Sequence, residues 1–163
     1  MDKEDKMAIL NYTTKIPVEK TVSEIEKMLS ESGAQKILKE YDDDGNVESI
    51  SFVINTENGN LSFKLPMNLD AVLQTLKSQS GEYKKRGYKV RKVPISMVNK
   101  EQAARVGWRI IKDWLEAQLA LFFLQMVKIE EIFLPYMYNE KTSKTMFEML
   151  EEKNFNLQLE HKE

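Results

Sequence analysis

The sequence predicts an α+β domain in which a three-stranded antiparallel sheet packs on a long central helix, with flanking shorter helices. Two observations carry this prediction. Apolar residues alternate at period two across residues 35–65, as in antiparallel strands with one buried face. Across residues 99–126 they recur instead at helical spacing. Because a chain of 163 residues buries one hydrophobic core, we expect a single domain over residues 1–163.

The first elements are a strand-like stretch and an amphipathic helix. Residues 8–16 are strand-like, which leaves open an added N-terminal strand in the sheet. Pro17 ends this stretch, and Thr21 or Ser23 is expected to cap a helix that runs to Gly33. The apolar face of this helix consists of Val22, Ile25, Met28 and Leu29.

Three strands follow, with turn residues between them. Residues 42–46 read Asp-Asp-Asp-Gly-Asn and predict the first turn. Asn58-Gly59 is the strongest short hairpin signal in the chain, and Pro66 ends the third strand. The inward faces of the strands are predicted to be Ile37 and Tyr41, then Ile50, Phe52 and Ile54, then Leu61, Phe63 and Leu65.

The remaining elements are predicted to be helices. Asn68 caps one that continues to residue 77, and the long helix covers residues 99–126. Short helices are expected at residues 130–134 and 143–153, before a frayed tail at about residues 154–163. The expected core residues are Phe52, Phe63, Trp108, Ile111, Leu115 and Phe122. Because the long helix is apolar on two sides, it could also form the interface of a homo-oligomer, and the sequence leaves this possibility open.

The composition argues against most enzyme classes. The chain has no cysteine and one histidine, His161, so it lacks disulfides, thiolate metal sites and the residues of a catalytic triad. It contains neither a phosphate-binding loop motif nor a Gly-x-Gly-x-x-Gly turn. We therefore expect a protein that is not an enzyme and that uses no cofactor.

Two patterns invite a metal-site hypothesis, and neither is complete. Residues 40–47 place oxygen-bearing side chains and a glycine as a calcium loop does, but its twelfth position, counted from Glu40, is Ser51 rather than a glutamate. Lys64 ends a strand as the lysine of a restriction-type nuclease does, but the neighbouring metal-binding carboxylate is missing. We therefore expect no metal.

The sequence predicts a cytoplasmic protein that does not enter a membrane. Residues 1–7 are charged, whereas a secretory signal would be apolar there. The strongest apolar stretch, residues 117–127, spans eleven residues. A bilayer requires about 20.

A basic segment at about residues 78–95 is the best functional lead. It has no hydrophobic periodicity and is predicted to be an exposed loop or flap. Six of the 24 basic residues fall within residues 84–92, which leaves 18 basic residues against 26 acidic ones elsewhere. Cations of this density attract phosphates, and interleaved tyrosines offer stacking faces to unpaired bases. The candidate nucleic-acid-binding residues are Tyr83, Lys84, Lys85, Arg86, Tyr88, Lys89, Arg91 and Lys92.

Other interpretations of the charged and aromatic residues stay open. The basic segment could bind another acidic partner, or it could be a solvated loop. Arg105, Arg109 and Lys112 share a helix face that could follow phosphates. The alternative is a salt-bridged surface in which Arg109 pairs with Asp113 and Lys112 with Glu116.

The helix, three strands and helix of residues 21–77 follow the element order of double-stranded-RNA-binding domains. Asn68-Leu-Asp70 stands where that family has a lysine cluster, so the residues do not match. Further short motifs extend over most of the chain, at residues 12–14, 20–25, 33–34, 41–46, 104–114, 116–118 and 133–136. In these motifs the chain resembles uncharacterised proteins encoded by bacteriophages and prophages of Gram-positive bacteria. The resemblance implies a phage setting and no functional residue.

Two functions are consistent with these observations. The first is a non-enzymatic phage accessory protein that binds nucleic acid, preferentially single-stranded, through the basic tyrosine-containing segment. The alternative is a phage-encoded interaction factor that inhibits or recruits a host protein, such as a defence protein, for which nine methionines and the long apolar helix supply adaptable contact surface.

Overall fold

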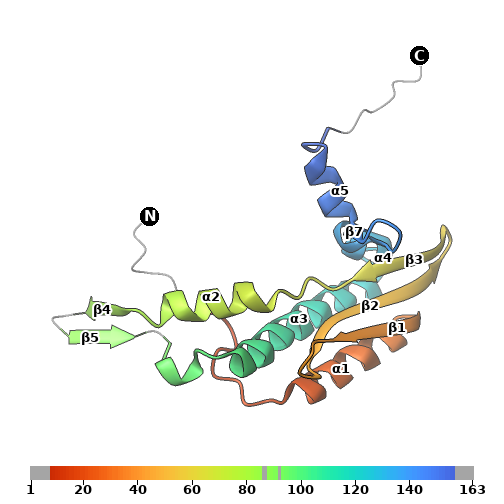
Figure 1. The fold of residues 1–163 in the computed structure, drawn as a ribbon. Coiled ribbons are helices and arrows are strands. Elements are labelled where there is room, and N and C mark those ends of the chain that lie inside the picture. The colour runs from red at the N-terminus through yellow and green to blue at the C-terminus, as the bar shows by residue number, and fades with distance from the viewer. Residues whose placement is uncertain (1–7, 86–87, 92, 157–163) are drawn as a thin grey trace.

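A computed structural model describes residues 8–85, 88–91 and 93–156 and shows an α+β fold (Figure 1). The long helices and the three-stranded sheet are α1 (Val18–Glu31), β1 (Ala34–Tyr41), β2 (Val47–Thr56), β3 (Gly59–Lys64), α2 (Leu69–Gln79) and α3 (Lys100–Phe123). The shorter elements are β4 (Glu82–Lys85), β5 (Tyr88–Arg91), η2 (Ile95–Met97), α4 (Ile129–Phe133), η3 (Leu134–Tyr136), β6 (Tyr138–Asn139), β7 (Lys144–Thr145) and α5 (Met146–Glu152).

The main sheet has the order β1-β2-β3, and both pairings are antiparallel, as predicted. In its register Ile37 pairs with Phe52, which pairs with Phe63, so these three residues lie on one face. The turn between β2 and β3 consists of residues 57 and 58. Gly59 follows it as the first residue of β3, with a φ of 96°. The Asn58-Gly59 signal is thus offset by one residue: glycine is needed there because left-handed backbone is costly for other residues.

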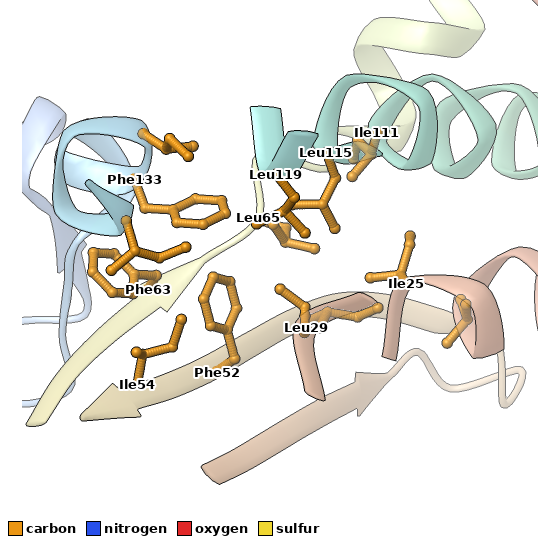
Figure 2. Close-up of a cluster of buried hydrophobic side chains, with 14 of the residues drawn as sticks. Ile25, Leu29, Phe52, Ile54, Phe63, Leu65, Ile111, Leu115, Leu119 and Phe133 are labelled. Carbon is orange, nitrogen blue, oxygen red and sulfur yellow. The ribbon is translucent and has the colours of Figure 1, made fainter. Parts of the chain in front are cut away.

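The core lies between this face of the sheet and the helices α1, α3 and α4 (Figure 2). Phe133 of α4 contacts Phe52 and Phe63 of the sheet, with ring centroids 5.1 and 5.6 Å apart. The predicted core residues Phe52, Phe63, Trp108, Ile111 and Leu115 are buried, and Phe122 is half-buried at the edge of this cluster. The period-two and helical patterns therefore identified these core faces, except that Tyr41, predicted to face inward, is 55% exposed because the register of β1 shifts between Glu40 and Tyr41.

A second, smaller apolar cluster joins α2 to α3 beyond the sheet. Leu76, Val93 and Ala103 are fully buried in it. Ile9 and Tyr12 of the N-terminal segment pack against them. This cluster supports the part of the molecule from which β4 and β5 extend.

The N-terminal segment is not a strand, contrary to the prediction. Residues 10–13 form a turn, in which Asn11 has a φ of 61°. The side chain of Gln102, which is buried on α3, donates hydrogen bonds of 2.9 Å to the carbonyl oxygens of both Tyr12 and Thr14. This side chain therefore satisfies backbone groups that a strand partner would otherwise have to satisfy.

Helix α1 begins earlier than predicted, with Pro17 at its N-cap and Thr21 buried inside it. The fixed φ of proline is compatible with a helix start, and no side chain caps α1. The predicted cap Asn68 is confirmed, since it accepts a hydrogen bond from a backbone N–H of α2, and Asn99, the predicted first residue of the long helix, caps α3 in the same way. Helix α3 ends at Phe123, three residues before the predicted end.

The C-terminal part forms a small unit beside the sheet. It contains α4, η3, the β6–β7 pair and α5, which projects away from the sheet (Figure 1). Of the predicted frayed tail, residues 154–156 are described and follow α5 with a turn closed by a 2.8 Å hydrogen bond from Phe155 N–H to Leu150 O. Residues 157–163 lie outside the described residues. In the described part of the chain, no helix is long and apolar enough to span a membrane.

Candidate functional site

The strands β4 and β5 form an antiparallel hairpin that projects beyond the end of α2, away from the three-stranded sheet (Figure 1). At its base, Val93 N–H donates a 3.1 Å hydrogen bond to Gln79 O. The side-chain Oε1 of Gln79 accepts a second hydrogen bond, 2.8 Å long, from Ile9 N–H. Because Val93 is also fully buried in the second cluster, the hairpin extends from a fixed base. No other described element packs extensively against it.

The register of the hairpin divides its residues between two faces. Directly paired residues of antiparallel strands belong to the same face, and successive residues alternate. One face holds the pairs Glu82–Arg91 and Lys84–Lys89, and we call it the cationic face. The opposite face holds the pairs Tyr83–Val90 and Lys85–Tyr88, and we call it the tyrosine face.

The hairpin corrects the prediction of an irregular loop. Six of the eight predicted site residues lie in its strands: Tyr83, Lys84, Lys85, Tyr88, Lys89 and Arg91. Arg86 and Lys92 lie outside the described residues. The strands were missed because cations occupy many of their positions, so the period-two pattern is not apolar. A signal was nevertheless present, since tyrosine and valine favour strands and Arg86-Gly87 separates two runs of similar sequence.

The cations on α3 are engaged by carboxylates, as the salt-bridged alternative predicts. Arg109 Nη1 lies 2.6 Å from an oxygen of Glu24 on α1, and its side chain is 17% exposed. Lys112 is bonded to Glu116, and Arg105 to Glu101. Their positive charges are therefore largely compensated within the protein.

The predicted ion pair between Arg109 and Asp113 is wrong. Asp113 does not pair with Arg109 but accepts a 2.8 Å hydrogen bond from Asn11 Nδ2. Glu24, which is 85 residues away in the sequence, takes its place. A tertiary contact with α1 has thus replaced the expected pair within α3.

The acidic turn between β1 and β2 is occupied by its own hydrogen bonds. Asp42 Oδ1 accepts from the backbone N–H groups of Asn46 and Asp44, at 2.8 and 3.0 Å. The hydrogen bond from Asn46 is the main reason that the pKa of Asp42 lies below its ordinary value. Strands flank the turn, as the sequence predicted. Among the described residues, no three histidine, aspartate or glutamate side chains are grouped to hold a metal ion.

A cleft of about 1080 Å³ lies where the first residues of α1, α2 and α3 approach this turn. Its lining contains more acidic than basic side chains. Four lining carboxylates have no hydrogen-bond or ion-pair partner within the described part of the chain: Glu19, Asp44, Glu48 and Asp70. A polyanion is repelled by such a surface, so the cleft and the hairpin differ in the ligands that they attract.

The structure therefore separates a projecting hairpin with several cationic positions from a body in which the cations of α3 are paired with carboxylates. The sequence identified the residues of the hairpin, and the register adds their distribution over two faces. Comparisons with family models, with curated proteins and with solved structures find no match for the chain.

Proposed function

We propose that this chain is a non-enzymatic, phage-encoded accessory protein that binds nucleic acid, preferentially with unpaired bases, through the β4–β5 hairpin. The observation that carries the proposal is the register, which pairs Lys84 with Lys89 next to Arg91 on one face of a projecting ribbon. Like charges at directly paired positions destabilise a hairpin. A bound phosphate relieves this repulsion, so an anionic ligand stabilises the hairpin that holds it.

The charge distribution supports a definite orientation of the ligand. Without the six basic residues of the segment, the chain has 18 basic residues against 26 acidic ones. The acidic cleft adds unpaired carboxylates to this negative body. A polyanion is therefore repelled from the body and attracted to the hairpin. In this arrangement the acidic residues raise the selectivity of the approach rather than oppose binding.

The aromatic positions favour single strands over duplexes. Tyr83 and Tyr88 occupy diagonal positions on the tyrosine face. Diagonal neighbours are roughly 7–8 Å apart, about two steps of a stacked strand. Stacking on an aromatic ring contributes about 1–3 kcal/mol per base, and it requires a base face that is not already covered. Phosphate contacts carry no sequence information, so we expect little sequence preference.

Fluorescence anisotropy with labelled single- and double-stranded DNA and RNA tests the proposal. The logarithm of the affinity should fall with the logarithm of salt concentration, with a slope of about −2 for three phosphate contacts and about −4 for six. The triple variant Lys84→Glu/Lys89→Glu/Arg91→Glu should abolish binding.

The matched control places the same charge change on the body, at exposed lysines that form no described ion pair: Lys20, Lys36 and Lys141. Reversing these three charges should leave most of the affinity. Absence of binding at low salt, or equal losses in the two triple variants, would refute the proposal.

A second candidate function is favoured by an exposed apolar group at the C-terminal end of α3. Phe123, Leu124 and Met126 are 58%, 69% and 68% exposed. Exposed apolar groups of this kind are typical of protein interaction sites, which fits a factor that binds a host protein. A photo-crosslinking residue at position 123 should capture one host protein reproducibly, whereas the same residue at the equally exposed Leu10 should not. If the two positions give the same products, this candidate fails.

A further inference from the structure

Strand β1 is an open edge of the main sheet (Figure 1). It pairs with β2 on one side, and no described strand pairs with it on the other. Five of its eight residues are exposed, among them Leu38, whose exposed fraction is 59%. The edge of a sheet presents unpaired backbone N–H and C=O groups, to which a further strand can be added.

The hydrogen bonds of the sheet show which backbone groups of β1 are free. Leu65 N–H donates a 2.9 Å hydrogen bond to Ile50 O, so the backbone groups of Ile50 point toward β3. Lys39, the partner of Ile50 in β1, therefore belongs to a non-hydrogen-bonded pair, and its own N–H and C=O point away from β2. Those of Ile37, two residues earlier, point the same way. No described backbone group outside the sheet bonds to either residue.

The exposed side chains of this edge carry opposite charges on either side of an apolar residue. Lys36, Leu38 and Glu40 alternate with core-facing residues and lie on the face of the sheet opposite the helices. Lys36 is exposed and has no ion-pair partner within the described part of the chain. Glu40 contacts Ser49 and Lys64 through Oε2, which leaves Oε1 without a described contact.

We propose that the partner of this edge is β1 of a second copy of the chain, in antiparallel orientation, with Leu38 at the two-fold axis. Lys36 of each copy then faces Glu40 of the other, and the two Leu38 side chains meet between these ion pairs. A two-fold interface of this kind uses the same surface of both copies. The two three-stranded sheets join into one continuous sheet.

The backbone favours this register over its neighbours. It places Ile37 opposite Lys39 of the second copy, so the free groups of both residues form hydrogen bonds with each other. The charged pairs then fall at non-hydrogen-bonded positions, where facing side chains are closest. A shift of two residues in one direction places Lys39 opposite Lys39, and in the other it places Lys36 opposite Leu38. Neither shifted register keeps a Lys–Glu pair within residues 36–40.

The irregularities of β1 limit the pairing to the same stretch. The register with β2 shifts between Ala34 and Lys36, and again between Glu40 and Tyr41. Residues 36–40 therefore form the regular part of the edge, because a bulge bends a strand and disrupts its ladder. The self-complementary charges lie at the two ends of this regular part.

Sedimentation velocity of the full chain over a wide range of concentrations tests the pairing. We expect a reversible dimer that Leu38→Arg converts to a monomer, because two like charges then meet at the axis. Circular dichroism should show an unchanged fold, since Leu38 is exposed. Lys141→Glu is the control, at an exposed lysine outside β1 that has no described ion pair, and it should dimerise like the wild type.

A charge exchange between copies tests the register itself. Lys36→Glu and Glu40→Lys should each raise the dissociation constant of the dimer by about tenfold or more, because both ion pairs become repulsive. An equimolar mixture of the two variants should restore dimerisation, since every facing pair in the mixed dimer is again of opposite charge. Failure of the mixture to recover would overturn this register.

Cross-linking provides a second measurement, because the chain contains no cysteine. Facing residues at a non-hydrogen-bonded position have Cα atoms about 4.5 Å apart, which a disulfide can bridge. Leu38→Cys should therefore form a covalent dimer when treated with oxidised glutathione. Lys36→Cys is the register control: its two copies are separated by four residues along the strand, about 13 Å, which is too far for a disulfide.

Two results would overturn pairing through β1: a monomer at every concentration, or a dimer that Leu38→Arg leaves intact. The hairpin projects away from the sheet, so these results are independent of nucleic-acid binding (Figure 1). Leu38→Arg should accordingly keep the affinity of each chain for nucleic acid.

Discussion

Replacing Trp108 by alanine should remove a large part of the stability of the fold. The Trp108 side chain is fully buried, and its Nε1 donates a 3.2 Å hydrogen bond to Val47 O at the start of β2. Emptying a buried tryptophan site costs about 3–5 kcal/mol. The carbonyl of Val47 then also loses its partner, which adds about 1 kcal/mol. The total free energy of unfolding of a domain is about 5–15 kcal/mol, so this loss is severe.

Urea unfolding followed by far-ultraviolet circular dichroism measures this loss without relying on tryptophan fluorescence. With a urea dependence of about 2 kcal/mol per molar, the midpoint should fall by about 2–3 M. Trp108→Phe keeps most of the volume and should show mainly the cost of the lost hydrogen bond, about 1 kcal/mol. Trp114→Phe is the control, since Trp114 is only half-buried. An unchanged midpoint for Trp108→Ala would show that this residue does not belong to the core.

Three further predictions concern single positions. The Ser49 hydroxyl is the main reason that the pKa of Glu40 lies below its ordinary value. A lowered folded-state pKa stabilises the protein above the unfolded-state pKa, and this contribution is lost as the pH falls through the folded value, so Glu40→Gln should flatten the acid side of the stability profile. NMR titration of Glu40 should show a higher pKa in Ser49→Ala. Asn99→Ala removes the N-cap of α3 and should cost about 1 kcal/mol in urea unfolding. Gly59→Ala should cost about 1–2 kcal/mol because its φ is 96°, although a Cβ there has free space; Gly81→Ala, at ordinary φ, should be nearly neutral.

The main sheet and the long helix could be predicted because their patterns are local and repetitive. Phe52 and Phe63 alternate with polar neighbours, and Trp108 and Leu115 recur at helical spacing, so each pattern identifies its own buried face. The turn at residues 10–13 could not be predicted in this way. It depends on Gln102, whose side chain comes from another part of the sequence.

The candidate site was predictable in its residues and not in its geometry. A run of cations is visible in any reading of the sequence, but it hides the period of the strands that carry it. Which residues share a face depends on the register of the two strands. In the structure this register pairs Lys84 with Lys89, and the sequence alone does not show that pairing. The same limit applies to Arg109: the sequence shows that carboxylates are near it along the helix, while the packing of α1 decides that Glu24 is the one it binds.

The hydrogen bond between Gln79 and Val93 has a consequence for how the chain tolerates change. These two residues are already held together at the base of the hairpin, and Val93 is buried there. The intervening residues 80–92 therefore form an insertion whose ends are fixed by the body. Closing such an insertion costs free energy that grows only slowly with its length. The hairpin is thus a module: it can be lengthened, shortened or exchanged for one of different charge while α2, α3 and the sheet keep their packing, so the charge of this segment can change separately from the fold.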